Sequence, residues 1–166
     1  MVSRLLAAPV EQARRDLRRP RTAAAWALLA GWSALVTALH VYGLDEGVYT
    51  AVPWWDLLTH TMGGIGVAAF LWLSYRRHGP PSGAPLWLVP AVLLIGAGFE
   101  VYEYLFKSFW WEWTLRYYAV DTVIDLVLDA AGAGVVTVAV AARRAWTSTD
   151  GTATDPAAAT TESFEG

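Results

Sequence analysis

The stretch YYAVDTVIDLVLDAAGAGVVTVAVAARRAW, from Tyr117 to Trp146, decides the fold of this chain. After its first residues it is apolar almost to its end, and it closes on two arginines, which is typical of a membrane-spanning helix. Three aspartates nevertheless enter it at every fourth position, Asp121, Asp125 and Asp129. An aspartate near the centre of a bilayer costs about 2.5–3.5 kcal/mol on insertion scales, so three on one stripe need a physical reason.

The composition places the whole chain in a membrane setting. Of the 166 residues, 55% are hydrophobic and only 16% are charged, whereas soluble domains carry about 25% charged residues. There is no cysteine, which excludes disulfides, thiolate metal ligands and cysteine catalysis. The formal net charge of −3 is uninformative because the basic residues are gathered in a few clusters.

Four stretches have the roughly 20 mostly apolar residues that a transmembrane helix needs. They are residues 22–42, about 53–75, about 85–106 and about 119–142, and short links join them, so neighbouring spans should run antiparallel. We therefore predict an all-α fold, a four-helix antiparallel transmembrane bundle. Residues 1–21 would be a basic segment on the membrane surface, residues 22–144 the transmembrane domain, and residues 145–166 a disordered acidic tail.

The arginines predict the orientation of the bundle. Ten of the twelve basic residues lie in the N-terminal segment, in the link after the second span and at the end of the fourth span. With four spans these regions share one side of the membrane, and the positive-inside rule makes that side, with both termini, cytoplasmic. We expect a multi-pass protein of the cell (plasma) membrane. The N-terminal arginines are interpreted as a topology signal that contacts anionic membrane lipids, and no nucleic acid is expected as a partner.

Seven ionisable residues fall in the half of the membrane opposite the basic clusters, at overlapping depths. Within each span they are three, four or eight positions apart, so each set lies on one helical face. They are Asp56 and His60 in the second span, Glu100 and Glu103 in the third, and Asp121, Asp125 and Asp129 in the fourth.

These groups point to a metal site, because six carboxylates and one imidazole cannot all be ionised together in lipid. No lysine or arginine of the sequence falls at their depth, so bound cations are the simplest partners. Oxygen ligands favour Mg²⁺ or Mn²⁺, and carboxylates with one histidine also hold Fe²⁺ or Zn²⁺. We therefore expect all seven residues to bind a divalent metal cofactor of undetermined identity. His40, at the outer end of the first span, is a weaker candidate for the same site.

Each of these features also has a simpler interpretation. The aspartate stripe fits a proton or ion path without bound metal, Glu100 and Glu103 fit an interfacial pair that reaches water, and a lone histidine is usually a hydrogen-bonded core residue. The glycines within the spans are expected at helix–helix contacts. They are Gly63, Gly64, Gly66, Gly96, Gly98, Gly132 and Gly134.

Three motifs resemble, in order, those of the YjdF-like family of small integral membrane proteins of bacteria and archaea. They are WDLLTH (55–60) followed by two glycines, EVYE (100–103), and DTVID (121–125) with a glycine and an alanine downstream. The resemblance covers the last three spans and implies a shared fold and site, but no reaction. Asp129 departs from the family pattern, which often has a small residue at that position.

Several functions fit these motifs. The first is a metal-dependent enzyme that acts on a lipid-linked substrate near the outer leaflet. The aspartate spacing is similar to the D-x-x-x-D elements of CDP-alcohol phosphotransferases and UbiA-type prenyltransferases, although the glycine-alanine-arginine part of the former is absent. The alternatives are a protein that handles cations or protons, and a structural or accessory membrane protein without catalysis. The sequence decides neither between them nor the oligomeric state.

Overall fold

The computed structural model describes residues 2–77, 84–108 and 110–152, and within these ranges the chain forms six helices and no strand. Four helices are long and apolar enough to cross a membrane. These are α2 (Pro20–Asp45), α4 (Trp55–Tyr75), α5 (Leu88–Phe106) and α6 (Leu115–Thr152). The other two are α1 (Val2–Asp16) and the single turn α3 (Val48–Ala51). The prediction of an all-α protein with four candidate spans is confirmed.

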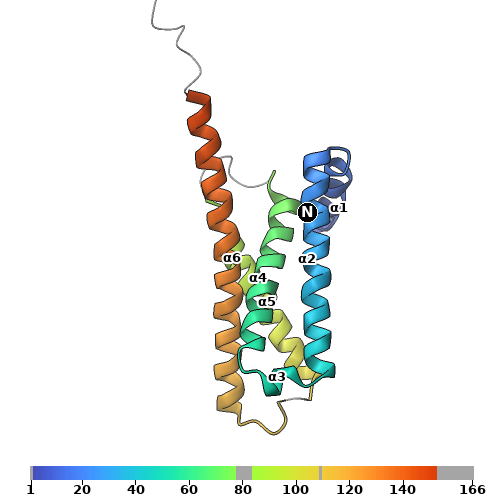
Figure 1. Ribbon diagram of the computed structural model, residues 1–166, viewed down its shortest axis with the longest axis vertical. Coiled ribbons are helices and arrows are strands. Elements are labelled where there is room, and N and C mark those ends of the chain that lie inside the picture. The colour runs from blue at the N-terminus through green and yellow to red at the C-terminus, as the bar shows by residue number, and fades with distance from the viewer. Residues whose placement is uncertain (1, 78–83, 109, 153–166) are drawn as a thin grey trace, which may run out of the picture.

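The four long helices stand side by side and alternate in direction (Figure 1). Helix α4 is central, because it packs against α2, α5 and α6, whereas the described part of α2 makes no backbone contact with α5 or α6. The three helices that carry the predicted site therefore form the inner group, and α2 lies beside it. We call the end at which α4 and α6 begin the acidic end, and the opposite end, where α1 lies, the basic end.

Helices α4 and α6 pack closely because glycines bring their backbones together. A Cβ atom at Gly64 would collide with the backbone of Asp129, and one at Gly132 would collide with the backbone of Thr61 and lie 2.7 Å from the backbone nitrogen of Ile65. Small residues at such crossings let membrane helices gain van der Waals contact. This pair of glycines fixes how the polar faces of α4 and α6 oppose each other.

The other glycines divide into two groups. Gly66 lies against the indole of Trp32 from α2, which donates a hydrogen bond of 2.9 Å to the backbone carbonyl of Met62. Gly96 also lies at a helix contact. For three glycines the expectation of helix contacts is wrong, because a Cβ atom there would meet nothing within 4 Å. These are Gly63, Gly98 and Gly134.

Asp16 fastens α1 to the basic end of the bundle. Its side chain is 2% exposed and accepts hydrogen bonds from Arg76 Nη2 (2.7 Å), Trp26 Nε1 (3.0 Å) and Gln12 Nε2 (2.9 Å). Burial alone would raise the pKa of Asp16, but the two neutral hydrogen bonds and the charge of Arg76 outweigh it and hold the pKa below its ordinary value. The basic N-terminal segment is thus largely a helix packed on the bundle, and its placement on the membrane surface stays a prediction.

Helix α6 is longer than the span predicted within it. It has 38 residues, or about 57 Å at 1.5 Å per residue, and it rises past the other helices at the basic end (Figure 1). It begins four residues before the predicted span and continues through residues 145–152 of the predicted tail. The remainder of that tail, and residues 78–83 of the second predicted link, lie outside the described residues.

Candidate metal centre

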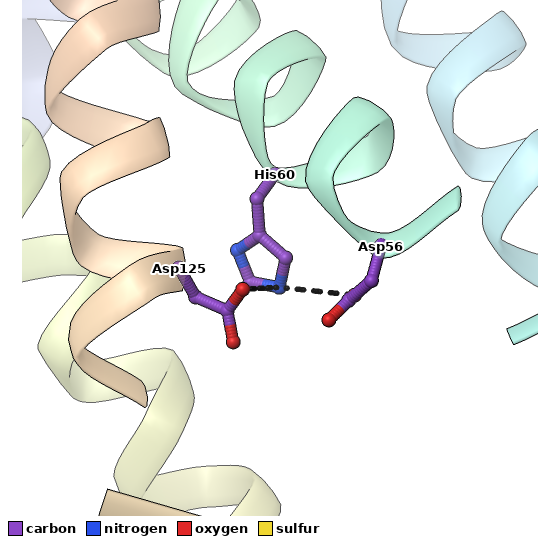
Figure 2. A group of neighbouring side chains, drawn as sticks. All are labelled: Asp56, His60 and Asp125. Atoms are coloured by element: carbon purple, nitrogen blue, oxygen red, sulfur yellow. Dashed lines mark ion pairs between the residues drawn. The ribbon is translucent and has the colours of Figure 1, made fainter. Parts of the chain in front are cut away.

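Three side chains from two helices converge between α4 and α6 at the acidic end. Asp56 and His60 stand one turn apart at the start of α4, and Asp125 faces them from α6 (Figure 2). One ligand atom from each lies within 4.8 Å of the other two. His60 Nε2 is 3.6 Å from Asp56 Oδ1 and 3.8 Å from Asp125 Oδ1. We call these three residues the triad.

Asp129 approaches the same histidine from the other side. Its Oδ1 is 3.6 Å from His60 Nδ1, the ring nitrogen that is not directed at the triad carboxylates. Its Oδ2 lies against Gly96 of α5, where a Cβ atom would collide with it. Both ring nitrogens of His60 are therefore flanked by carboxylates, two on one side and one on the other.

The remaining three predicted acids lie near the triad without joining it. The side chain of Glu100 is buried, and its Oε2 accepts a hydrogen bond of 2.9 Å from the hydroxyl of Thr122 in α6. Glu103 and Asp121 are half-buried and, like Glu100, interact electrostatically with His60. The structure thus gathers the acids of α5 and α6 at one end of the bundle, but only Asp125 comes within ligand distance of both Asp56 and His60.

His40 reaches the site indirectly, through a chain of hydrogen bonds. Its Nδ1 is 2.7 Å from the hydroxyl of Tyr49 in α3, which in turn donates to Thr59 Oγ1 at 3.3 Å. The hydroxyl of Thr59 donates to the backbone carbonyl of Asp56 at 3.0 Å. Burial raises the pKa of Tyr49 above its ordinary value of 10.0, so its hydroxyl stays protonated at neutral pH.

Sequence reasoning missed three polar neighbours of the triad. Tyr49 lies in a link between spans, where no helical spacing pointed to it. Thr59 and Thr122 stand inside the quoted motifs, three residues after Asp56 and one after Asp121, but a pattern of ionisable residues does not include hydroxyl groups. The hydroxyl of Thr59 bonds the backbone of its own helix, as is usual in membrane helices, whereas that of Thr122 donates to a side chain of another helix.

The triad suits a divalent metal ion. An ion bonded at about 2.0–2.2 Å holds neighbouring ligand atoms roughly 3.0–3.5 Å apart, so the two distances from His60 Nε2 need only small inward movements. One nitrogen and two carboxylate oxygens suit Zn²⁺, Mn²⁺ or Fe²⁺. In the described part of the chain the ion pairs of these carboxylates all go to His60, whereas the buried Asp16 is paired with an arginine.

The fold and this cluster define a multi-pass helical membrane protein with a polar site inside its bundle. The chain belongs to the family described as Predicted membrane protein (DUF2238), the YjdF-like family, whose model matches residues 16–146 and so covers three of the four candidate spans and most of the fourth. No curated protein and no solved structure matches the chain.

Proposed function

We propose that this protein binds a divalent metal ion at Asp56, His60 and Asp125 and uses it on a lipid-linked substrate at the outer leaflet of the plasma membrane. The observation that carries the proposal is the triad itself, because ligand atoms from two helices come within 4.8 Å inside a membrane bundle. Ionisable residues inside a membrane are costly, and they are retained where they pair with one another, with a cation or with a substrate.

The position of the triad suits a substrate anchored in lipid. Asp56 is in the first turn of α4, so the site lies close to the acidic end of the bundle. A headgroup can reach this depth while its acyl chains stay in the hydrocarbon. Three protein ligands leave further coordination positions for water or substrate, and a metal held in this way polarises an ester or phosphoryl group and lowers the pKa of bound water. Glu103 and Asp121, which are half-buried beside the triad, would accept a proton or help to hold a second ion.

A second candidate function is proton or cation handling. The observation that favours it is the chain from His40 through Tyr49 to Thr59, which leads from the end of α2 to the backbone of Asp56. Such a protein would be free of metal as purified and indifferent to chelators. The metal content of the protein therefore separates the two candidates.

The first arm of the test is metal content. Protein purified without a polyhistidine tag should contain a divalent metal by elemental analysis, and His60→Asn and Asp125→Asn should each lose most of it. Asp45→Asn is the matched control, because it removes an exposed carboxylate from the acidic end outside the triad and should leave the content unchanged. Metal-free wild-type protein that takes up no added Mn²⁺, Fe²⁺ or Zn²⁺ would contradict the proposal.

The second arm is turnover. Wild-type protein and Asp125→Asn are incubated with a total lipid extract, with and without a chelator, and the products are compared by mass spectrometry. We expect a product that appears only with metal-loaded wild-type protein. A protein that holds metal at the triad but converts no lipid would be an accessory protein whose metal only joins α4 to α6, and the enzymatic part of the proposal would be wrong.

A further inference from the structure

We infer that Asp129 is a positioning residue for His60: its carboxylate accepts the proton on Nδ1, which fixes the ring and leaves Nε2 free to bind the metal between Asp56 and Asp125. The inference rests on the proposed metal site and assigns to Asp129 a role different from that of a ligand. The two nitrogens of the His60 ring lie near different carboxylates.

The two sides of the ring are not equivalent. Nε2 has two carboxylate oxygens within 3.8 Å, one from each helix, so an ion there would gain three protein ligands. Among the described residues, the carboxylate that approaches Nδ1 is that of Asp129, at 3.6 Å, so an ion on this side would have two protein ligands, His60 and Asp129. The metal therefore belongs on the Nε2 side. A neutral imidazole that binds metal through Nε2 carries its proton on Nδ1, and that proton needs an acceptor.

Asp129 is built into the position of that acceptor. Its backbone lies against Gly64, one turn beyond His60 on α4, and helical side chains point back toward the start of their own helix. Its carboxylate is thereby directed at the level of His60. Gly96 of α5 supplies the space for Oδ2, because a Cβ atom there would collide with it. Three helices thus shape the location of one carboxylate, whose side chain is only 13% exposed.

The distance of 3.6 Å between Nδ1 and Oδ1 is about 0.6–0.7 Å longer than a formed hydrogen bond of this kind. A small rotation of either side chain closes it. A histidine ligand whose second nitrogen donates to a carboxylate is the common arrangement at metal sites, and loss of such a partner typically lowers metal affinity about 10–100-fold. Asp129 should therefore affect metal binding through the ring rather than through a bond to the ion.

The test observes directly the ring nitrogen of His60 that does not bind the metal. Cu²⁺ is added to purified protein without a polyhistidine tag, and electron spin echo envelope modulation records the quadrupole lines of the ring nitrogen that is not bound to copper. The frequencies of these lines depend on the hydrogen bond that this nitrogen donates. The chain has three histidines, so His60→Asn should abolish the lines and His40→Asn should retain them.

We expect Asp129→Ala to keep the lines, shift their frequencies and weaken Cu²⁺ binding about 10–100-fold. Asp129→Asn, which keeps the shape and an acceptor oxygen, should give a smaller shift and a smaller loss. Asp45→Asn is the charge control, since it removes the same charge from an exposed position at the acidic end outside the triad; it should leave the frequencies unchanged.

Three results would contradict the inference, and each is distinguishable. Frequencies in Asp129→Ala that coincide with those of the wild type would overturn the role of Asp129 and leave the metal site standing. A folded Asp129→Ala protein that binds no Cu²⁺ would make Asp129 a ligand instead. Wild-type protein without nitrogen lines that depend on His60 would defeat the proposed function itself, and the inference with it.

Discussion

His60 is the residue at which the polar faces of α4 and α6 meet. Its two ring nitrogens lie within 3.6–3.8 Å of three carboxylates, and its side chain is 14% exposed. Asp125 is the most buried of the three, with 5% of its side chain exposed. A buried carboxylate without a compensating charge is unfavourable, whereas the same carboxylate bound to a cation is stabilised. Removing the charge of Asp125 should therefore lower the thermal stability of the protein when metal is bound, and should leave it unchanged or raise it when metal is absent.

Asp125→Asn should melt lower than wild-type protein when Mn²⁺ or Zn²⁺ is present, and at the same temperature or higher after chelation. A ligand that binds only the folded state stabilises it by about 2.7 kcal/mol at a hundredfold excess over its Kd, so the shift in the presence of metal should be several degrees. Thermal unfolding in detergent, with and without chelator, measures the melting temperature of each protein in both conditions. A variant less stable than wild type by the same margin in both conditions would show that Asp125 has only a structural role.

At the level of single residues, the sequence predicted which side chains gather but not how they divide. Helical spacing placed Asp121, Asp125 and Asp129 on one face of one helix. It could not show that Asp125 faces Nε2 of His60 and Asp129 faces Nδ1, because that depends on how far α4 is turned about its axis against α6. Gly64 and Gly132 set that rotation by direct backbone contact. Tyr49 was missed because it comes from a link, where position follows from the chain's path and not from periodicity.

At the scale of elements, the contact between α4 and α6 predicts different outcomes for two adjacent glycines. Gly64→Ala should destabilise the bundle by about 1–3 kcal/mol, the usual cost of overpacking a close contact, because the new methyl group would collide with the backbone of Asp129. Gly63→Ala is the matched control, since a Cβ atom there meets nothing within 4 Å. Unfolding of the purified proteins in a titration with a denaturing detergent compares them. Equal stabilities would mean that the two helices can separate without cost.

The docking of α1 predicts a dependence on pH. The pKa of Asp16 is held below its ordinary value of 3.8, so its stabilising contacts are fully present above that pH and are lost as the pH falls through the lower, folded-state value. Amide hydrogen exchange in α1 should be slow and constant between about pH 5 and 7, after correction for the intrinsic rate, and should accelerate below about pH 4.

Asp16→Asn should accelerate the same exchange already at neutral pH, because the amide leaves Arg76 without its buried counter-charge. Removing one partner of a fully buried pair costs about 3–5 kcal/mol; with 22% of the Arg76 side chain exposed, we expect the lower end of that range. Glu11→Gln is the control, since Glu11 pairs with Arg15 at 3.9 Å on the exposed side of α1. Exchange that is unaffected by Asp16→Asn would show that α1 is held by its apolar contacts alone.

The elements themselves were largely predictable, because about 20 apolar residues can only span a membrane as a helix. Their ends were not. Helix α6 continues to Thr152 through a segment of polar residues that apolar length cannot detect. The docking of α1 was also hidden, because it depends on Asp16 meeting Arg76, a residue 60 positions away in the sequence.

At the scale of the whole molecule, the positive-inside rule predicts that the basic end of the bundle faces the cytoplasm. Since the chain has no cysteine, a cysteine introduced at Ser108 should react with an impermeant maleimide on intact cells, and one at Ser82 only after lysis. The reverse pattern would place the triad on the cytoplasmic side, where soluble nucleotide-linked substrates could reach it.

The glycine contacts between α4 and α6 also decide from which direction a lipid tail can approach. Backbones that meet at Gly64 and Gly132 leave no width for an acyl chain between these two helices. The backbone contact between α4 and α5 is sparser, so for the lipid-linked substrate proposed above we expect the tail to lie along that flank while its headgroup stays near Asp56. If the proposed enzymatic function is correct, its substrates should tolerate long or branched tails, because the tail would remain among the surrounding lipids and never be enclosed.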